Sequence, residues 1–219
     1  MPDLRFSVQG AAARAHCLTP TLALHLMIDA DPRPVAAVAL DCQVRIDAQR
    51  RRYSAAEKER LGELFGAPAR WGQTLRSLLW TQAAVSVPPF EEHAEVELEL
   101  PCTTDFNILA GKYFNLLDPG GAVPLTLLFS GSVFYRDAEG LLQVTRIPWS
   151  AEATFELEVR TWRDVLALYY PNTTWVALRQ DVFDALYAYR VRHGCLDFDD
   201  VVTRLLEATT ASTNEGRLR

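Results

Sequence analysis

One stretch of the chain, residues 123–149, constrains the fold most, because it has a clear strand, turn and strand pattern. Its first arm carries apolar side chains on both faces, which is typical of a strand covered on both sides at the centre of a sheet. Asp137 and Gly140 interrupt the apolar pattern, and glycine adopts the positive φ of a tight turn without steric cost. The stretch predicts a long β-hairpin whose first arm is central in its sheet.

Other strands are predicted where apolar and polar residues alternate. The segment from Glu95 to Leu100 alternates without interruption, so its glutamates should face water and its apolar residues a core. Gly10 and the alanines after it should end the first strand. The apolar positions are Leu4, Phe6, Val8, Leu22, Leu24, Leu26, Ile28, Val38, Leu40, Cys42, Val44, Ile46, Val85, Val87, Val96, Leu98, Leu100, Phe155, Leu157 and Val159.

Helices are predicted from capping residues and a period of three to four. Ser54 and Glu57 form a capping box that begins a helix ending near Gly66. A second helical piece starts at Pro68 and places four apolar residues on one face: Trp71, Leu75, Leu78 and Leu79. Later helices are predicted after an N-cap at Asp105, from Trp162 to about Tyr170 with Thr161 as the cap, over 181–193, and over 198–208.

These elements predict a mainly β protein with helices, of the α+β class. The expected architecture is an antiparallel β-sandwich with a helical insertion, about 54–80, and C-terminal helices, about 161–208, packed on its flank. No break in composition divides the chain, so residues 1–208 should form a single domain, followed by a flexible tail, 209–219. Phe183, Leu186 and Tyr187 are expected to dock on the sheet beside Trp162 and Trp175.

Charge and composition disfavour several classes of function. The formal net charge of -6 argues against a nucleic-acid partner, since phosphate neutralisation needs an excess of Lys and Arg. Only residues 49–53, QRRRY, are dense in positive charge, and a solvated strand end is favoured there over an anion site. The chain has no apolar run that could span a bilayer and no N-terminal leader, which predicts a soluble, cytoplasmic protein without a membrane span.

The sequence indicates no catalytic residue, cofactor or bound metal. The four cysteines form no CxxC pair and are expected to be reduced, and His16-Cys17 has no second ligand pair nearby. The many glutamates alternate along strands, which favours a solvated sheet face over a catalytic pair of carboxylates. No motif of a known hydrolase, dinucleotide or phosphate site occurs. A non-enzymatic protein is therefore the favoured hypothesis.

Aromatic residues gather in the second half of the chain. Such clusters form either the seam between sheet and helices or a surface for a protein partner, and the seam is favoured. If part of the cluster is exposed, Tyr169-Tyr170-Pro171 at a helix end is the first candidate. The weak candidates for binding residues are Tyr169, Tyr170, Trp175 and Trp149.

Several runs of the sequence resemble a bacterial family of unknown function: CQVRIDAQRRRYS, WGQTLRSLLW, KYF, LFSGSVFYR and IPWS. The resemblance covers nearly the whole chain and implies no activity. Genes of this family often lie near those of high-affinity nickel-iron hydrogenases, which implies an accessory, assembly or scaffold role. The segment from Phe183 to Leu186 also resembles the start of the last helix in the preprotein-translocation chaperone.

Two main hypotheses follow. The first is a non-enzymatic cytoplasmic accessory protein that binds a protein partner, with a link to hydrogenase assembly. The second is a β-sandwich that binds a small ligand in an aromatic pocket, with a chaperone-like binder as a related alternative. An enzyme of unrecognised type is the third and least favoured hypothesis. The sequence does not identify the partner, the ligand or the oligomeric state.

Overall fold

The structure is a computed structural model that describes residues 2–31, 34–102, 109–173 and 176–216, with side chains as far as Thr209. It divides into two compact units, Met1–Trp175 and Val176–Arg219, and each is described by itself. The first unit holds two antiparallel sheets and helices, so the α+β class with a sandwich of sheets is confirmed. The prediction of a single domain over 1–208 stays a prediction.

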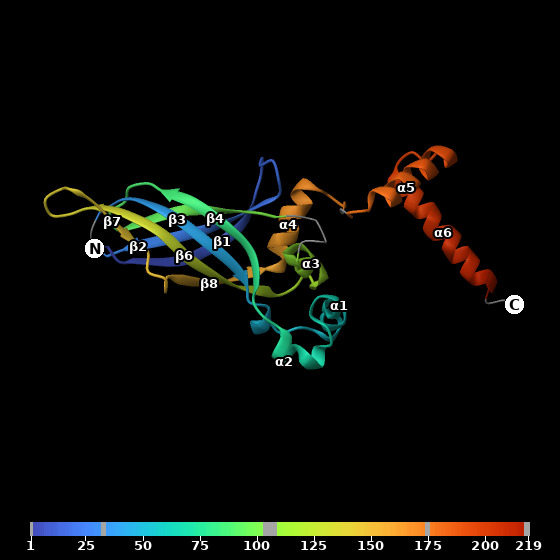
Figure 1. Ribbon diagram of the computed structural model, residues 1–219, viewed down its shortest axis with the longest axis horizontal. Coiled ribbons are helices and arrows are strands. Elements are labelled where there is room, and N and C mark those ends of the chain that lie inside the picture. Colours follow the sequence, from blue (N-terminus) through green and yellow to red (C-terminus); the bar gives the residue numbers. More distant parts are fainter. Residues whose placement is uncertain (1, 32–33, 103–108, 174–175, 217–219) are drawn as a thin grey trace. The chain divides into compact units, whose positions relative to one another are not determined.

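The first sheet has three strands in the order β1-β2-β5: β1 (Leu4–Arg14), β2 (Thr21–Ala30) and β5 (His93–Pro101). The second sheet has the order β4-β3-β6-β7, and β8 also pairs with β6. Its strands are β3 (Val35–Ile46), β4 (Leu78–Val87), β6 (Ala122–Arg136), β7 (Leu142–Arg146) and β8 (Glu152–Glu158). Figure 1 shows the strands lying alongside one another in a sandwich.

Strand β6 is the centre of the second sheet, as the sequence predicts. Along one side it pairs with β3 from Leu125↔Ile46 to Tyr135↔Val35. Along the other side its first half pairs with β8 and its second half with β7. The hairpin turn follows, with Gly140 at φ 81°.

The core lies between the two sheets. The rings of Phe6 on β1 and Phe129 on β6 stack with centroids 4.2 Å apart, which places the sheets face to face. The alternating apolar residues of β2 and β3 are buried as predicted. On β5 and β8, Leu98, Leu100 and Leu157 are buried, Val96 and Phe155 are half-buried, and the glutamates are exposed, so this alternation is confirmed.

The helices of the first unit gather at one end of the sandwich, opposite the β6–β7 hairpin (Figure 1). The insertion after β3 contains a short helix η1 (Ala48–Arg50), α1 (Ala55–Phe65), η2 (Pro68–Arg70) and α2 (Trp71–Thr74). Helix α3 (Leu109–Leu116) precedes β6, and α4 (Val159–Tyr169) follows β8 and lies against β1 and β2. Trp162 of α4 is buried and stacks on Phe114 of α3, with ring centroids 5.0 Å apart.

The second unit is a pair of helices, α5 (Gln180–His193) and α6 (Phe198–Gly216). Gly194 ends α5 in the left-handed conformation, with φ 62°. Phe183 of α5 packs against Tyr187 and against Phe198 of α6, at ring centroid distances of 6.4 and 5.4 Å. Phe183 is nevertheless 40% exposed, so these partners within the unit do not enclose it.

Three boundaries differ from the sequence prediction in the β-rich part. Strand β1 does not end at Gly10 but continues to Arg14, because a bulge between Val8 and Gly10 absorbs the irregularity. Leu78 and Leu79 are not helical, because pairing with β3 draws them into β4. Val159 is not the end of a strand but the first residue of α4, with Glu158 rather than Thr161 at the N-cap.

The helix predictions differ in extent. The capping box of Ser54 and Glu57 is confirmed, and α1 ends at Gly66 as expected. Helix α6 runs to Gly216, beyond the expected end at residue 208. The predicted N-cap Asp105 and the docking residue Trp175 lie outside the described residues.

Gly131 offers a test of the central strand. Its φ is 133°, and a Cβ there would lie 2.0 Å from the carbonyl oxygen of Ala39 on β3. Gly131→Ala should therefore lower the free energy of unfolding by roughly 3 kcal/mol or more. Gly120→Ala is the matched control, since a Cβ at that position meets no atom within 4 Å. Chemical denaturation of both variants checks this, and equal stabilities would contradict the described contact.

Candidate functional site

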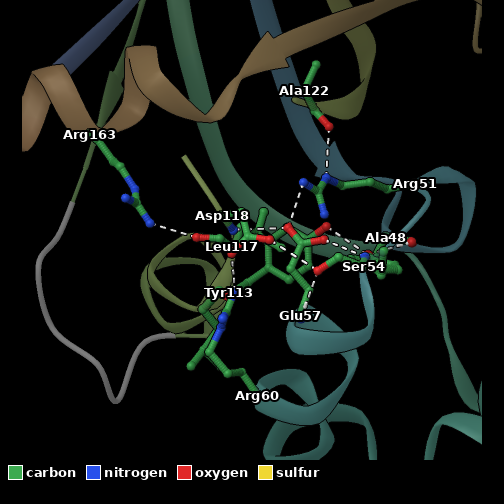
Figure 2. A network of polar contacts seen from close by, with 12 residues as sticks. Ala48, Arg51, Ser54, Glu57, Arg60, Tyr113, Leu117, Asp118, Ala122 and Arg163 are labelled. Carbon is green, nitrogen blue, oxygen red and sulfur yellow. Dashed lines mark hydrogen bonds and ion pairs between the residues drawn. The ribbon is translucent and has the colours of Figure 1, made fainter. Parts of the chain in front are cut away.

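A buried ion pair lies where the helical insertion meets the start of β6. Nη2 of Arg51 lies 2.9 Å from Oε1 of Glu57, and the exposed fractions of the two side chains are 7% and 4%. Nε of Arg51 donates to the carbonyl oxygen of Ala122 at 2.9 Å. The guanidinium also lies over the ring of Tyr53, 5.1 Å from its centroid. Figure 2 shows Arg51 between Ala122 and Glu57.

Glu57 is held by hydrogen bonds to both carboxylate oxygens. Oε2 accepts from the backbone N–H of Ser54 at 2.9 Å, and Oε1 accepts from that of Asp118 at 3.0 Å. The first of these bonds belongs to the capping box, so the local sequence fixes the carboxylate at the start of α1. One side chain thus joins the start of α1 to the link between α3 and β6.

The charged form of Glu57 is favoured in the fold. Burial by itself raises the pKa of this carboxyl group, because low dielectric penalises charge. The hydrogen bonds from Arg51 and from the backbone of Ser54 and Asp118 outweigh burial, so the pKa lies below its usual value. Glu57 is therefore an anion at neutral pH and is not suited to act as a general acid.

A more exposed network surrounds the pair (Figure 2). Arg60 donates to Oδ1 of Asp118 at 2.5 Å, and Ser54 Oγ donates to Oδ2 at 3.1 Å. The bond from Arg60 is the main reason that the pKa of Asp118 lies below its usual value. Arg163 of α4 donates to the carbonyl oxygen of Leu117 at 2.6 Å. The network thereby connects α1, α4 and the chain after α3.

Tyr53 and Tyr113 form a second layer against Arg51. Their hydroxyl oxygens are 2.8 Å apart, and that of Tyr53 donates to the carbonyl oxygen of Ala48 at 2.7 Å. Burial raises the pKa of both phenols. Trp71 meets the ring of Tyr53 edge to face at 5.4 Å and donates to the carbonyl oxygen of Gly66. These two tyrosines are neutral hydrogen-bonding groups.

An open hollow of about 420 Å³ lies beside this cluster. Nη1 of Arg51 is buried and has no hydrogen-bond partner among the described residues. Such a donor costs about 1–3 kcal/mol when it stays unsatisfied, which favours an acceptor beside it. The hollow is lined by Gln49, Arg51, Tyr53, Trp71, Gly72, Leu75 and Arg76.

Tyr169 and Tyr170 lie at the end of α4 and have different surroundings. The hydroxyl of Tyr169 donates to the carbonyl oxygen of Arg14 at 2.7 Å and accepts from the N–H of Cys17 at 2.9 Å, so Tyr169 fixes the link between β1 and β2. Tyr170 lines a second open hollow of about 510 Å³. The other lining residues are Asn115, Trp162, Arg163, Leu166, Ala167, Asn172 and Thr173.

Among the candidates that the structure describes, Trp149 does not lie with Tyr169 and Tyr170. Trp149 is 95% exposed and lies between β7 and β8. The extended strand β8, with a rise of about 3.3 Å per residue, separates it from α4 and its tyrosines. Trp175 lies outside the described residues. Tyr169 and Tyr170 are therefore neighbours at one helix end, whereas Trp149 is exposed elsewhere.

Helix α5 has an unusual surface. None of its residues is buried, although Phe183, Tyr187 and Val191 recur every four residues along one stripe. Among the described side chains of the second unit, only Cys195 and Val201 are buried hydrophobic residues. The exposed apolar residues of the unit include Val176, Leu178, Val182, Phe183, Tyr187, Val191, Leu196 and Val202.

The described part of the chain has no cluster of metal-binding side chains. Within the described residues, no group of three or more His, Cys, Asp and Glu side chains is placed to hold a metal ion. All four cysteines are free, and burial raises the pKa of Cys42 and of Cys102 to about 12, so these two are unreactive thiols. No helix in the described part of the chain is long and apolar enough to cross a membrane.

Sequence reasoning missed the buried pair. The run QRRRY predicts a solvated strand end, and the structure does leave Arg50 and Arg52 exposed. Arg51 between them is buried instead, because Ala122 and Glu57 supply acceptors. The capping box was the available signal, since it fixes a carboxylate close to the arginines.

Fold and site together define an α+β sandwich protein whose helical end is held by a buried ion pair. The chain belongs to the family of unknown function DUF6084, whose family model matches residues 1–214. The predicted membership of a family without known function is thus confirmed, and the hydrogenase association stays a prediction.

Other comparisons add little. No curated protein matches the chain. One similar solved structure is a β-glucosidase from Kluyveromyces marxianus, with 12% identity and a TM-score of 0.27. The match covers 71% of this chain and 15% of that one. At this TM-score the likeness carries no argument about fold or function.

The ion pair can be tested with Glu57→Gln. The substitution leaves the buried guanidinium of Arg51 without its counter-charge, so the free energy of unfolding should fall by about 3 kcal/mol or more. Glu63→Gln on the same helix is the control, because Glu63 pairs with Lys112 at the surface with 66% of its side chain exposed. Glu63→Gln should lower the free energy of unfolding by less than about 1 kcal/mol. Denaturant unfolding at pH 7 measures the free energy of unfolding of both variants.

The same variant tests the pH dependence. The pKa of Glu57 is lower in the folded than in the unfolded chain, so its contribution is fully present above the usual value of 4.5. It is lost as pH falls through the lower, folded pKa. The difference in stability between the wild type and Glu57→Gln should therefore shrink in acid. A difference that stays constant from pH 7 to pH 3 would contradict this assignment.

Proposed function

We propose that this protein is a non-enzymatic accessory protein that binds another protein through the helix pair α5–α6. The observation that carries the proposal is that α5 buries none of its side chains while it presents an apolar stripe. A helix of a folded domain normally covers apolar residues at this spacing with its own core. In the second unit taken by itself, Phe183, Tyr187 and Val191 stay 40%, 51% and 67% exposed.

The size of the second unit supports the need for a partner. A helix pair this short buries little apolar surface, and isolated units below about 40 to 60 residues are marginal without further contacts. The unit Val176–Arg219 has Cys195 and Val201 as its buried apolar residues among the described side chains. Binding of the stripe in an apolar groove of another protein supplies the missing burial, in the manner of helix-in-groove recognition.

The residues outside the helix pair support a non-enzymatic role. Glu57 and Asp118 are held as anions by their hydrogen bonds, and burial makes the thiols of Cys42 and Cys102 unreactive. The resemblance noted in the sequence makes subunits and maturation factors of nickel-iron hydrogenases the first partners to test. A cytoplasmic location belongs to the same proposal.

A second candidate function is the binding of a small ligand near Tyr170. The hollow there is lined by Trp162, Tyr170 and polar groups such as Asn115 and Asn172, a combination that many ligand sites share. The stripe on α5 is the more specific feature, because it repeats at the spacing of a binding helix. A chaperone-like binder would use the same stripe with less selectivity.

Val191→Asp tests the main proposal. Val191 is 67% exposed, so a charge there should leave the thermal melting of the chain unchanged. In an apolar groove the same charge is desolvated, so affinity for the partner should fall by about tenfold or more. Isothermal titration of the purified wild type and variant with each purified hydrogenase subunit and maturation factor measures this affinity.

Trp149→Ala is the control in the same titrations, since Trp149 is an exposed aromatic of the other unit. It should leave the affinity unchanged. A loss of affinity in this control alone would place the interface on the sandwich. A large drop in melting temperature for Val191→Asp would show that the stripe is covered by the chain's own first unit, and the proposal would then be wrong.

A further inference from the structure

We propose that the hollow beside Arg51 is a binding site for an oxyanion, a carboxylate or phosphate group carried on a small molecule with an apolar part. This site lies wholly in the first unit and is independent of the helix pair proposed to bind a protein. Its charged groups are the guanidiniums of Arg51 and Arg76.

The charge of the lining is opposite to that of the whole chain. The formal net charge is -6, yet the residues that line this hollow include two arginines and no carboxylate. Glu57, the partner of Arg51, is not part of the lining and is already bound by Nη2 and two backbone N–H groups. The charge of Arg51 is paired with Glu57, so the uncompensated positive charge in the lining is that of Arg76, and no carboxylate of the lining opposes it.

Arg51 is held in place before any ligand arrives. Its Nε is bound to Ala122 and its Nη2 to Glu57, while Nη1 is buried without a partner among the described residues. The side chain is 7% exposed, so it has lost its rotamer freedom already. Arg51 is therefore a fixed wall of the hollow that needs no further ordering when a ligand binds, and its buried Nη1 is not among the groups that we expect to touch the ligand.

Arg76 supplies the accessible charge. It is an exposed residue directly after Leu75, and its Nη1 donates to the carbonyl oxygen of Leu75 at 3.0 Å. Gln49 offers an amide at the rim of the hollow. Arg76 and Gln49 are the groups that we expect to touch the oxyanion directly.

The remaining lining residues indicate the chemistry of the rest of the ligand. Trp71, Leu75 and the ring of Tyr53 contribute apolar surface, and all three belong to the lining. The volume of about 420 Å³ exceeds that of a lone inorganic ion and lies within the range of about 300–1,000 Å³ that is usual for small-molecule sites. The ligand class is therefore an organic acid or a phosphate ester rather than a free ion.

The test uses the full chain and two defined probes, benzoate and inorganic phosphate, in isothermal titrations at constant ionic strength. We expect one of the probes to bind with a stoichiometry of one. Arg76→Gln should weaken that binding by about tenfold or more, because a charge-assisted hydrogen bond is lost. Arg76 is exposed, so this variant keeps its fold, which a melting curve verifies.

Arg52→Gln is the matched control, because it removes the same charge from an exposed residue outside the lining. Its dissociation constant should stay within about twofold of the wild type. Preference for benzoate would assign a carboxylate ligand, and preference for phosphate a phosphate ester. The proposal is overturned if neither probe binds at millimolar concentration, or if Arg52→Gln weakens binding as much as Arg76→Gln.

Discussion

The buried pair of Arg51 and Glu57 organises the helical end of the sandwich. Two charges removed from water are costly unless each finds partners, and a buried pair is stable only when its remaining hydrogen-bonding groups are satisfied. Glu57 meets this requirement with two backbone N–H groups from separate segments. Arg51 meets it at Nε, which donates to the carbonyl of Ala122, but Nη1 has no partner among the described residues. The demand for partners therefore fixes the start of α1, the chain after α3 and the start of β6 against one another.

The β-rich part was largely predictable because its signal is local. Alternation along β2, β3 and β5 identifies the buried face from each strand alone, and the hairpin of β6 and β7 is marked by its turn. Where prediction was wrong, pairing with another strand decided the outcome. Leu78 entered β4 because β3 offered a partner, and β1 passed Gly10 through a bulge opposite β2.

The candidate site was not predictable in the same way. Arg50, Arg51 and Arg52 share one local pattern, and only contacts with Glu57 and the distant Ala122 select the middle residue for burial. Tyr169 was a candidate for binding, but its hydroxyl is used by Arg14 and Cys17, which lie far away in the sequence. Residue type indicates which chemistry a side chain can perform. Only tertiary contacts show which of its hydrogen-bonding groups already have partners within the fold.

Unsatisfied buried donors and an unburied helix are exceptions to the packing of the rest of the molecule. The sandwich buries its alternating residues and satisfies nearly all of its described buried polar side chains, yet Arg45 Nε and Arg51 Nη1 have no partner there. Helix α5 carries Phe183, Tyr187 and Val191 four residues apart but buries none of its residues fully. Local exceptions of this kind tend to mark function, because they carry a cost in stability. Arg51 adjoins a hollow without a carboxylate in its lining, and α5 leaves Phe183, Tyr187 and Val191 exposed, so the two proposed binding sites lie at these two exceptions.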